Sequence, residues 1–157
     1  YADFDEYKQR LVASGEQFLA KAMLGRSKIA PKGLPFIRDG TRVLAVSRSR
    51  VVLSTLIAAA HRNRRFTVYC TESRPSCSGR KMARDLRNAG IPVTLIPDSA
   101  VGYVIEKVDF VICGAEAVVE SGGIVNAVGT FQACVIAKAY SKPVYAVAES
   151  FKFLRKY

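Results

Sequence analysis

The fold is indicated most clearly by the run Asp109-Phe110-Val111-Ile112-Cys113, which continues into Gly114-Ala115-Glu116 and, after a short interval, into Ser121-Gly122-Gly123 and Asn126-Ala127-Val128-Gly129-Thr130. The apolar run is typical of a buried strand, and a helical pattern follows from Phe131 to Tyr140. A strand that leads through a glycine-rich loop into a helix commonly builds an anion site, because glycine allows close backbone approach and the helix N-terminus offers free N–H groups. The glycine spacing is neither GxGxxG nor the Walker pattern, so the sequence predicts an anion-binding site but does not indicate which nucleotide, if any, it binds.

The same alternation of strand and helix runs through most of the chain. Short apolar strand patterns occupy Arg42–Val46, Phe66–Cys70, Val93–Ile96, Phe110–Cys113 and Val144–Val147. Helical patterns lie between them, at Arg50–Asn63, Ser78–Ala89, Ala100–Glu106 and Asn126–Tyr140. Strands that are apolar on both faces and alternate with helices indicate a parallel sheet covered by helices on both sides. The sequence therefore predicts an α/β fold of the Rossmann type, a parallel sheet flanked by helices.

An amphipathic helix is predicted ahead of the sheet. Its apolar positions near helical spacing are Phe4, Tyr7, Leu11, Phe18 and Ala22. We expect this helix over residues 1–26, as the end of a helical region, and a connecting loop from Ser27 to Gly40. The Rossmann-like C-terminal domain is expected over residues 41–157. Because the chain lacks an initiator Met, we expect it to be a fragment or a processed product, and we expect the C-terminal domain to be truncated. The first residues show no signal-peptide pattern.

Composition describes a globular and strongly basic protein. Half of its residues are hydrophobic, and the formal net charge is +11. No apolar run approaches the roughly 20 residues that a membrane-spanning helix needs. Basic residues concentrate between Arg48 and Arg87, where the acids are Glu72 and Asp85. One interpretation is a nucleic-acid footprint. Because no aromatic residues alternate with the arginines in a stacking pattern, a solvated helix face or a surface for acidic partners is favoured.

The cysteines and the histidine give no sign of a metal site. Cys70, Cys77, Cys113 and Cys134 form no CxxC pair, and His61 does not complete a zinc set with them at a familiar spacing. We predict reduced, buried thiols in a cytosolic protein that holds no metal and no cofactor.

Polar residues follow the ends of the predicted strands, at Ser47–Arg50, Thr71–Pro75, Pro97–Ser99 and Gly114–Glu116. The carboxyl ends of parallel strands meet at one edge of the sheet, where folds of this type bind ligands. We predict a phosphate-bearing ligand there, with Arg74 as the phosphate seat because a guanidinium can donate two parallel hydrogen bonds. The candidate ligand-binding residues are Ser47, Ser49, Arg74, Asp98, Glu116, Asn126 and Thr130. The simpler alternative is that these side chains only cap turns and helices.

Several motifs, in their order along the chain, resemble one protein superfamily. They are Thr71–Pro75, Pro97–Ala100, Gly114–Glu116, Asn126–Thr130 and Val147–Phe153. The superfamily holds the regulatory alpha, beta and delta subunits of eukaryotic translation initiation factor 2B, and isomerases of methylthioribose 1-phosphate and of ribose 1,5-bisphosphate. The resemblance covers essentially the whole chain. The runs Gly114–Glu120 and Ala148–Phe153 most resemble the alpha subunits.

Three positions depart from the isomerase pattern. The isomerases use a cysteine after the first strand, an aspartate in a Gly-Ala-Asp motif and a lysine in an Asn-Lys-x-Gly-Thr run, and this chain has Ser47, Glu116 and Ala127 there. An unassisted serine hydroxyl cannot supply thiolate chemistry. The extra methylene of glutamate displaces the carboxylate, and a shift of about 1 Å can reduce a rate on the order of a hundredfold. The resemblance therefore implies no catalytic residues, while it leaves a sugar phosphate or a nucleotide open as a ligand of the pocket.

The function implied by the resemblance is that of a regulatory, non-catalytic subunit of the complex that exchanges guanine nucleotide on translation initiation factor 2. Such a subunit is cytoplasmic, forms a homodimer, and joins the other subunits of the factor 2B complex. It helps the complex to sense the phosphorylated alpha subunit of factor 2, and neither a membrane nor direct nucleic-acid binding is expected. The alternative is a sugar-phosphate isomerase with an altered catalytic pair. A basic RNA-binding domain is a third interpretation, which rests on charge alone.

Overall fold

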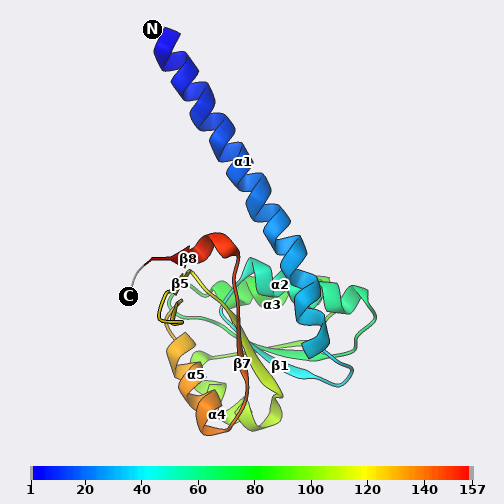
Figure 1. Cartoon of the computed structure of the whole chain (residues 1–157). Helices are drawn as coiled ribbons and strands as arrows, with labels where there is room; N and C mark the ends of the chain where they lie inside the picture. The colour runs from blue at the N-terminus through cyan, green and yellow to red at the C-terminus, as the bar shows by residue number, and fades with distance from the viewer. Residues whose placement is uncertain (1, 156–157) are drawn as a thin grey trace.

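A parallel sheet with helices on both faces forms the body of the protein, as described for residues 2–155 by a computed structural model (Figure 1). The strands lie in the order β3-β2-β1-β4-β7, and all neighbouring pairs are parallel. Their bounds are β1 Arg42–Val46, β2 Thr67–Thr71, β3 Val93–Ile96, β4 Phe110–Gly114 and β7 Val144–Val147. The predicted Rossmann-like α/β fold is confirmed, and the bounds of these strands agree with the prediction to within one residue.

The strands are apolar on both faces because each face covers a hydrophobic core. On β1, Val43 and Ala45 enter one core and Leu44 and Val46 enter the other. Helices α2 and α3 cover the first core, and α4 and α5 cover the second. The helices are α2 Arg50–His61, α3 Ser78–Asn88, α4 Val101–Val104 with the flanking 3-10 turns η2 Asp98–Ala100 and η3 Ile105–Lys107, and α5 Thr130–Ala139.

A second, smaller sheet occupies the place of the glycine-rich loop predicted between β4 and α5. Its strands lie in the order β6-β5-β8, with bounds β5 Ala117–Val119, β6 Ile124–Val125 and β8 Phe153–Leu154. The chain reverses between β5 and β6 because Gly122, with a φ of 85°, adopts the left-handed conformation that the turn requires. The prediction that the helix begins near Asn126 was wrong. Helix α5 begins at Thr130, because Gly129 before it has a φ of 93° and does not continue the helix.

The long N-terminal helix α1 (Ala2–Gly33) extends further than predicted, since the segment from Ser27 onward was expected to be a loop. Pro31 lies inside it, although a proline in a helix interior costs about 3 kcal/mol. The last turns pack against α2, where Ala30 is buried and Gly33 lies so close to Thr55 that a side chain would not fit. Tertiary packing therefore outweighs the proline signal, and the 3-10 turn η1 (Leu34–Phe36) follows.

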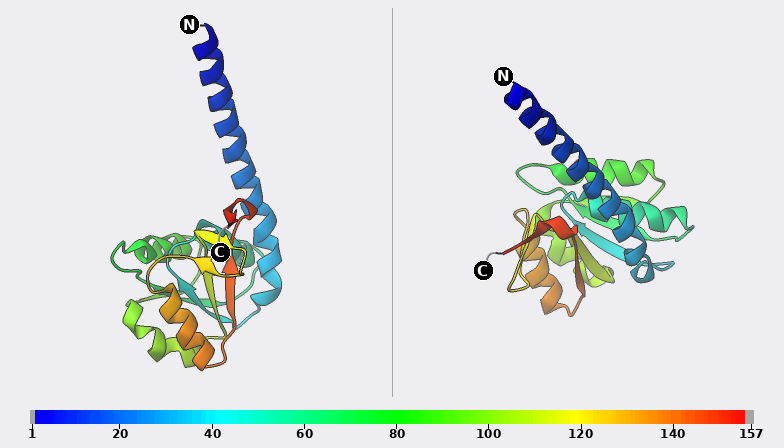
Figure 2. Two further views of the ribbon diagram at one scale, coloured as in Figure 1. Left: turned by 60° about the vertical axis from the view of Figure 1, so that its left-hand side comes forward. Right: turned by 45° about the horizontal axis from the view of Figure 1, so that its top comes forward.

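Most of α1 extends away from the sheet (Figure 1 and Figure 2). The helix is formed as predicted, but much of its apolar face is exposed, with Phe4 69% and Met23 68% accessible. Among residues 2–155, no helix has the length and apolar character needed to cross a membrane.

Candidate ligand-binding site

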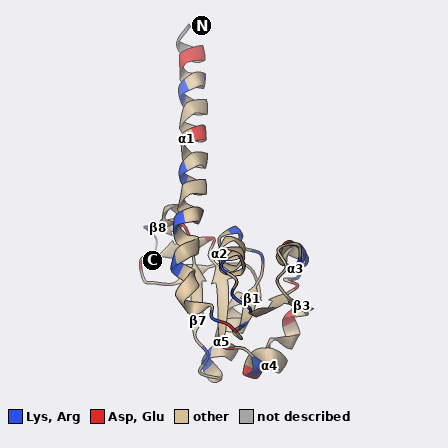
Figure 3. Cartoon of the chain, turned by 90° about the vertical axis from the view of Figure 1, so that its right-hand side faces the viewer, with Lys and Arg blue, Asp and Glu red and all other residues tan. Residues whose placement is uncertain are grey.

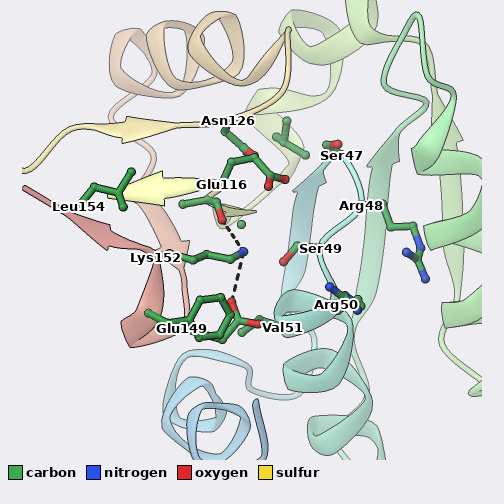
Figure 4. Close-up of a pocket in the computed structure, with 14 residues that line it drawn as sticks. Ser47, Arg48, Ser49, Arg50, Val51, Glu116, Asn126, Glu149, Lys152 and Leu154 are labelled. Atoms are coloured by element: carbon green, nitrogen blue, oxygen red, sulfur yellow. Dashed lines mark hydrogen bonds and ion pairs between the residues drawn. The ribbon is translucent and has the colours of Figure 1, made fainter. Parts of the chain in front are cut away.

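A polar cavity of about 390 Å³ opens at the carboxyl ends of β1 and β4. At this point the strand order reverses, because β2 and β3 lie on one side of β1 while β4 and β7 lie on the other. Doubly wound sheets bind their ligands at such a point. Figure 4 shows the lining, which residues 46–51, 114–116, 126, 149, 151, 152 and 154 provide.

Ser47 follows β1 directly, and its neighbours fix its position. Its backbone is left-handed, with a φ of 61°, and its N–H donates to Thr71 Oγ1 at 3.0 Å. Its hydroxyl accepts from Ser73 Oγ at 3.0 Å and lies 3.3 Å from Ser78 Oγ. A serine acts as a nucleophile when an adjacent base removes its proton. Because the partners of Ser47 are hydroxyls, this arrangement favours hydrogen bonding to a ligand over nucleophilic attack.

The N-terminus of α2 forms one wall of the cavity. Ser49 caps the helix by accepting a hydrogen bond from the backbone N–H of Val52 at 3.4 Å. Ser49, Arg50 and Val51 all line the cavity. The free N–H groups and positive end of the helix dipole favour an anion here, and the exposed guanidinium of Arg50 adds a full positive charge.

The opposite wall begins where β4 ends. Glu116 points into the cavity, and its backbone N–H donates to Val125 O at 2.8 Å (Figure 4). Asn126 lies beside it and donates from Nδ2 to Thr130 Oγ1 at 3.1 Å. A carboxylate repels phosphate but accepts hydrogen bonds from hydroxyl groups. The cavity therefore offers a cationic side at α2 and an acceptor side at Glu116.

The third wall is the turn η4 (Ser150–Lys152) and the residue before it. Lys152 Nζ donates to Ala115 O at 2.6 Å and lies 3.2 Å from Glu149 Oε2. Glu149 Oε1 also accepts from Arg26 Nε of α1 at 3.2 Å. Glu149 is 3% exposed, so this carboxylate is buried between two cations. Figure 4 shows Lys152 between Glu149 and the end of β4.

The charge of Glu149 is retained despite its burial. Burial alone would raise the pKa of this carboxyl, but its own backbone N–H, the Arg26 guanidinium and the Lys152 ammonium together lower the pKa below the ordinary value of 4.5. Glu149 is therefore ionised at neutral pH and neutralises part of the positive charge in the cavity wall.

The structure brings together four of the seven predicted ligand-binding residues. Ser47, Ser49, Glu116 and Asn126 line the cavity, and their binding of a ligand stays a prediction. Thr130 is buried and accepts from Asn126. Arg74 and Asp98 lie outside the lining.

Arg74, the predicted phosphate seat, lies outside this cavity, and its binding of a phosphate stays a prediction. Arg74 Nε donates to Glu72 Oε1 at 3.1 Å, and its side chain is 60% exposed. Asp98 accepts from the backbone N–H groups of Ser73 at 3.0 Å and Arg74 at 2.8 Å, so it fixes the loop after β2. Arg74 forms an ion pair with Glu72 at the surface, and the basic residues that line the cavity are Arg48, Arg50 and Lys152.

Sequence reasoning missed Arg50, Glu149 and Lys152 as members of the site. Arg50 lies in the polar segment after the first predicted strand, and the other two lie within the motif Val147–Phe153. Glu149 follows β7, whose end pairs with the end of β4, so the predicted parallel sheet could have placed it at this edge. No local pattern indicated the position of Lys152, which lies next to the pairing of β8 with β5.

The basic residues between Arg48 and Arg87 are distributed over α2, α3 and the loops beside them (Figure 3). Arg48 pairs with Asp85 at 3.4 Å, and Glu72 pairs with both Arg74 and Arg80. Four exposed basic residues lie on the outer side of α3, at Arg80, Lys81, Arg84 and Arg87. The solvated helix face that the charge pattern favoured is therefore present on α3.

Two of the four thiols are buried as predicted, and the other two are less buried than predicted. Cys70 and Cys113 are buried, while Cys77 and Cys134 are half-buried. Burial raises the pKa of Cys70 to about 12 and that of Cys113 to about 11, which keeps both thiols protonated. Among residues 2–155, no three His, Cys, Asp or Glu side chains are grouped so that they could hold a metal ion.

Comparison with known proteins identifies the family. The family described as the initiation factor 2 subunit family matches residues 1–157. The chain belongs to this family. It is 51% identical over 157 residues to translation initiation factor eIF2B subunit alpha of Dictyostelium discoideum, and the match covers 100% of this chain and 49% of that protein. The same subunit of Caenorhabditis elegans is 39% identical, over 98% of this chain and 49% of that protein.

The isomerase branch of the family is also related. The ribose 1,5-bisphosphate isomerase of Archaeoglobus fulgidus is 36% identical, over 97% of this chain and 49% of that protein. The chain thus spans about half the length of the curated relatives it matches.

Solved structures of family members have the same fold. Translation initiation factor eIF-2B of Pyrococcus horikoshii superposes with a TM-score of 0.84 at 32% identity, over 87% of this chain and 50% of that chain. A chain of the tetrameric eIF2B-beta2-delta2 complex of C. thermophilum superposes with a TM-score of 0.84 at 25% identity, over 98% of this chain and 50% of that chain.

Proposed function

We propose that this chain is the Rossmann-like part of a regulatory, non-catalytic subunit of the guanine nucleotide exchange complex for translation initiation factor 2. In this function the chain forms a homodimer, joins the other subunits of the complex in the cytoplasm, and helps the complex to sense the phosphorylated alpha subunit of factor 2. The observation that carries the proposal is the match of the whole chain, at 51% identity, to a protein named as the alpha subunit of eIF2B.

The chemistry of the cavity supports a non-catalytic function. Among residues 2–155, those that line the cavity include no cysteine and no histidine. Cys113 lies near the end of β4 but is buried and protonated. His61 is the last residue of α2. At a rise of about 1.5 Å per residue, it lies about 16 Å from Arg50, the first helical residue, which lines the cavity. Ser47 thus has neither a thiol nor an imidazole available to support isomerase chemistry.

The same cavity supports the binding of a sugar phosphate or a nucleotide as a regulatory ligand. Its phosphate would lie at the N-terminus of α2, between Arg50 and Lys152, and its hydroxyls would donate to Glu116. Charge-assisted hydrogen bonds of this kind contribute about 1.5–3 kcal/mol each before desolvation. The cavity thereby keeps a binding role for which a catalytic pair is not needed.

Reconstitution tests the proposal. The chain is mixed with the remaining subunits of the exchange complex, and the mass of the native particle and the nucleotide exchange rate are measured with unphosphorylated and phosphorylated factor 2. We expect the chain to enter the particle and to increase the inhibition of exchange by phosphorylated factor 2. In parallel, no turnover of methylthioribose 1-phosphate or ribose 1,5-bisphosphate is expected. Turnover that disappears in Ser47→Ala would establish the isomerase alternative instead.

A further inference from the structure

Helix α1 contacts the cavity through the turn η4. Arg26 Nε of α1 donates to Glu149 Oε1, and the phenyl rings of Phe18 and Phe151 meet edge to face with centroids 5.3 Å apart. A β carbon on Gly25 would lie 3.8 Å from Glu149 Cγ, so this part of α1 packs beside the Glu149 side chain. Both Glu149 and Phe151 line the cavity. The same short segment is therefore a wall of the cavity and a docking surface for α1.

The cation of this wall is shared between the cavity and the buried carboxylate. Lys152 Nζ is held by Ala115 O at 2.6 Å and by Glu149 Oε2 at 3.2 Å. The side chains of Lys152 and Arg26 are 21% and 22% exposed, against 4% for Glu149. The Glu149 carboxylate thus forms ion pairs with two cations, Arg26 of α1 and Lys152 of the cavity wall.

We propose that Glu149 and Arg26 are positioning residues of the cavity, through which helix α1 sets the availability of Lys152 to an anionic ligand. The inference rests on the proposed binding of a phosphate-bearing ligand in this cavity. When Arg26 contacts Glu149, the carboxylate is partly neutralised, and Lys152 is freer to contact a phosphate. When α1 moves away, the full charge of Glu149 acts on Lys152 and competes with the ligand.

The coupling is reciprocal, because two linked equilibria must affect each other by the same factor. When a phosphate draws Lys152 toward the cavity, Glu149 loses part of its interaction with Lys152. Its ion pair with Arg26 is then stronger, and this strengthens the docking of α1. Ligand binding in the cavity and the docking of α1 therefore both depend on how the Glu149 carboxylate pairs with Lys152 and Arg26.

The first test is the affinity of the 157-residue chain for inorganic phosphate and for ribose 5-phosphate, measured by calorimetry. We expect Arg26→Gln to weaken binding about three- to tenfold, because it removes the partly buried ion pair between Arg26 and Glu149. Glu149→Gln removes the competing charge, so it should bind at least as tightly as the wild type. In a Lys152→Met background, Arg26→Gln should cause no further loss.

The matched control is Arg10→Gln, which removes the same charge from the exposed part of α1, where Arg10 pairs with Glu6. A role in folding alone would weaken binding in both Arg26→Gln and Glu149→Gln. Equal losses in these two variants, or an Arg26→Gln affinity equal to that of Arg10→Gln, would overturn the proposal.

A second measurement needs no ligand. Amide hydrogen exchange at residues 115–116 and 149–152 should be about three- to tenfold faster in Arg26→Gln than in the wild type and unchanged in Arg10→Gln. If the wild type binds neither phosphate nor ribose 5-phosphate at millimolar concentration, the proposed ligand is wrong and the proposal is overturned with it. Unchanged exchange in Arg26→Gln would refute the coupling.

Discussion

Gly114 lies directly against Ser49, and a β carbon on Gly114 would stand 2.5 Å from the Ser49 hydroxyl oxygen and 2.7 Å from its β carbon. The end of β4 and the N-cap of α2 can approach this closely because position 114 has no side chain. This contact joins the two strand ends that form the cavity, so the width of the cavity depends on one glycine.

Gly114→Ala should therefore destabilise the fold and weaken phosphate binding. Overpacking of this kind costs about 1–3 kcal/mol, and the displaced N-cap withdraws the start of α2 from the ligand. Urea unfolding and calorimetry with phosphate measure the two effects. Gly102→Ala in α4 is the matched control, because a β carbon there meets no atom within 4 Å and alanine favours a helix. Equal stability of the two variants would contradict the role given to Gly114.

A second prediction concerns the pH dependence that Glu149 confers. Because its pKa is lowered on folding, the carboxylate stabilises the folded chain above the unfolded-state value of about 4.5, and the contribution is lost as the pH falls through the folded-state value. Glu149→Gln should lower the free energy of unfolding by about 1.5–3 kcal/mol at pH 7, the value of hydrogen bonds to a charged group.

Urea unfolding at pH 7 and at a series of lower pH values measures this contribution. The difference between the wild type and Glu149→Gln should shrink below pH 4.5 and vanish in strong acid. Glu6→Gln serves as the control, since its pair with Arg10 is exposed and contributes about 0–1 kcal/mol. A difference that stays constant with pH would show that Glu149 acts only through packing.

The sheet could be predicted closely because its physical signal is local. Strands buried on both faces must be apolar throughout, and Phe110–Gly114 shows this in five consecutive buried residues. The hairpin of β5 and β6 was missed because its strands are short and a glycine-rich turn joins them. The extension of α1 to Gly33 was missed because packing on α2, which is a tertiary effect, overrides the proline signal.

The candidate site divides in the same way. Ser47, Ser49 and Glu116 follow strands, so the topology of a parallel sheet predicts that they converge. The direction of the Arg74 side chain depends on its pair with Glu72, which the sequence does not show. Glu149 follows β7, whose end pairs with the end of β4, so the same topology places it at this edge. Lys152 lies beyond the turn η4, next to the pairing of β8 with β5, which is a long-range contact with no local signal.

A third prediction distinguishes the two possible phosphate seats. Lys152→Met and Arg50→Met should each weaken phosphate binding about tenfold or more, because each removes a cation from the cavity wall. Arg74→Met removes the same charge from an exposed side chain outside the cavity and should leave the affinity unchanged. Calorimetry with ribose 5-phosphate measures all three variants. Loss of binding in Arg74→Met alone would restore the seat that the sequence predicted.

The last prediction concerns the homodimer. Three large apolar side chains are exposed at α5. Val128, just before the helix, is 80% exposed, and Phe131 and Val135, within it, are 83% and 50% exposed. Burial of one such side chain contributes about 1.5–3 kcal/mol, so this surface can stabilise a pair of identical chains about a two-fold axis. Phe131→Asp should raise the dissociation constant of the dimer at least tenfold, as measured by sedimentation. Gln132→Asp adds the same charge at the next position, which is also exposed, and should have little effect. A wild-type chain that is monomeric at high micromolar concentration, or a dimer equally tight in both variants, would exclude this surface as the interface.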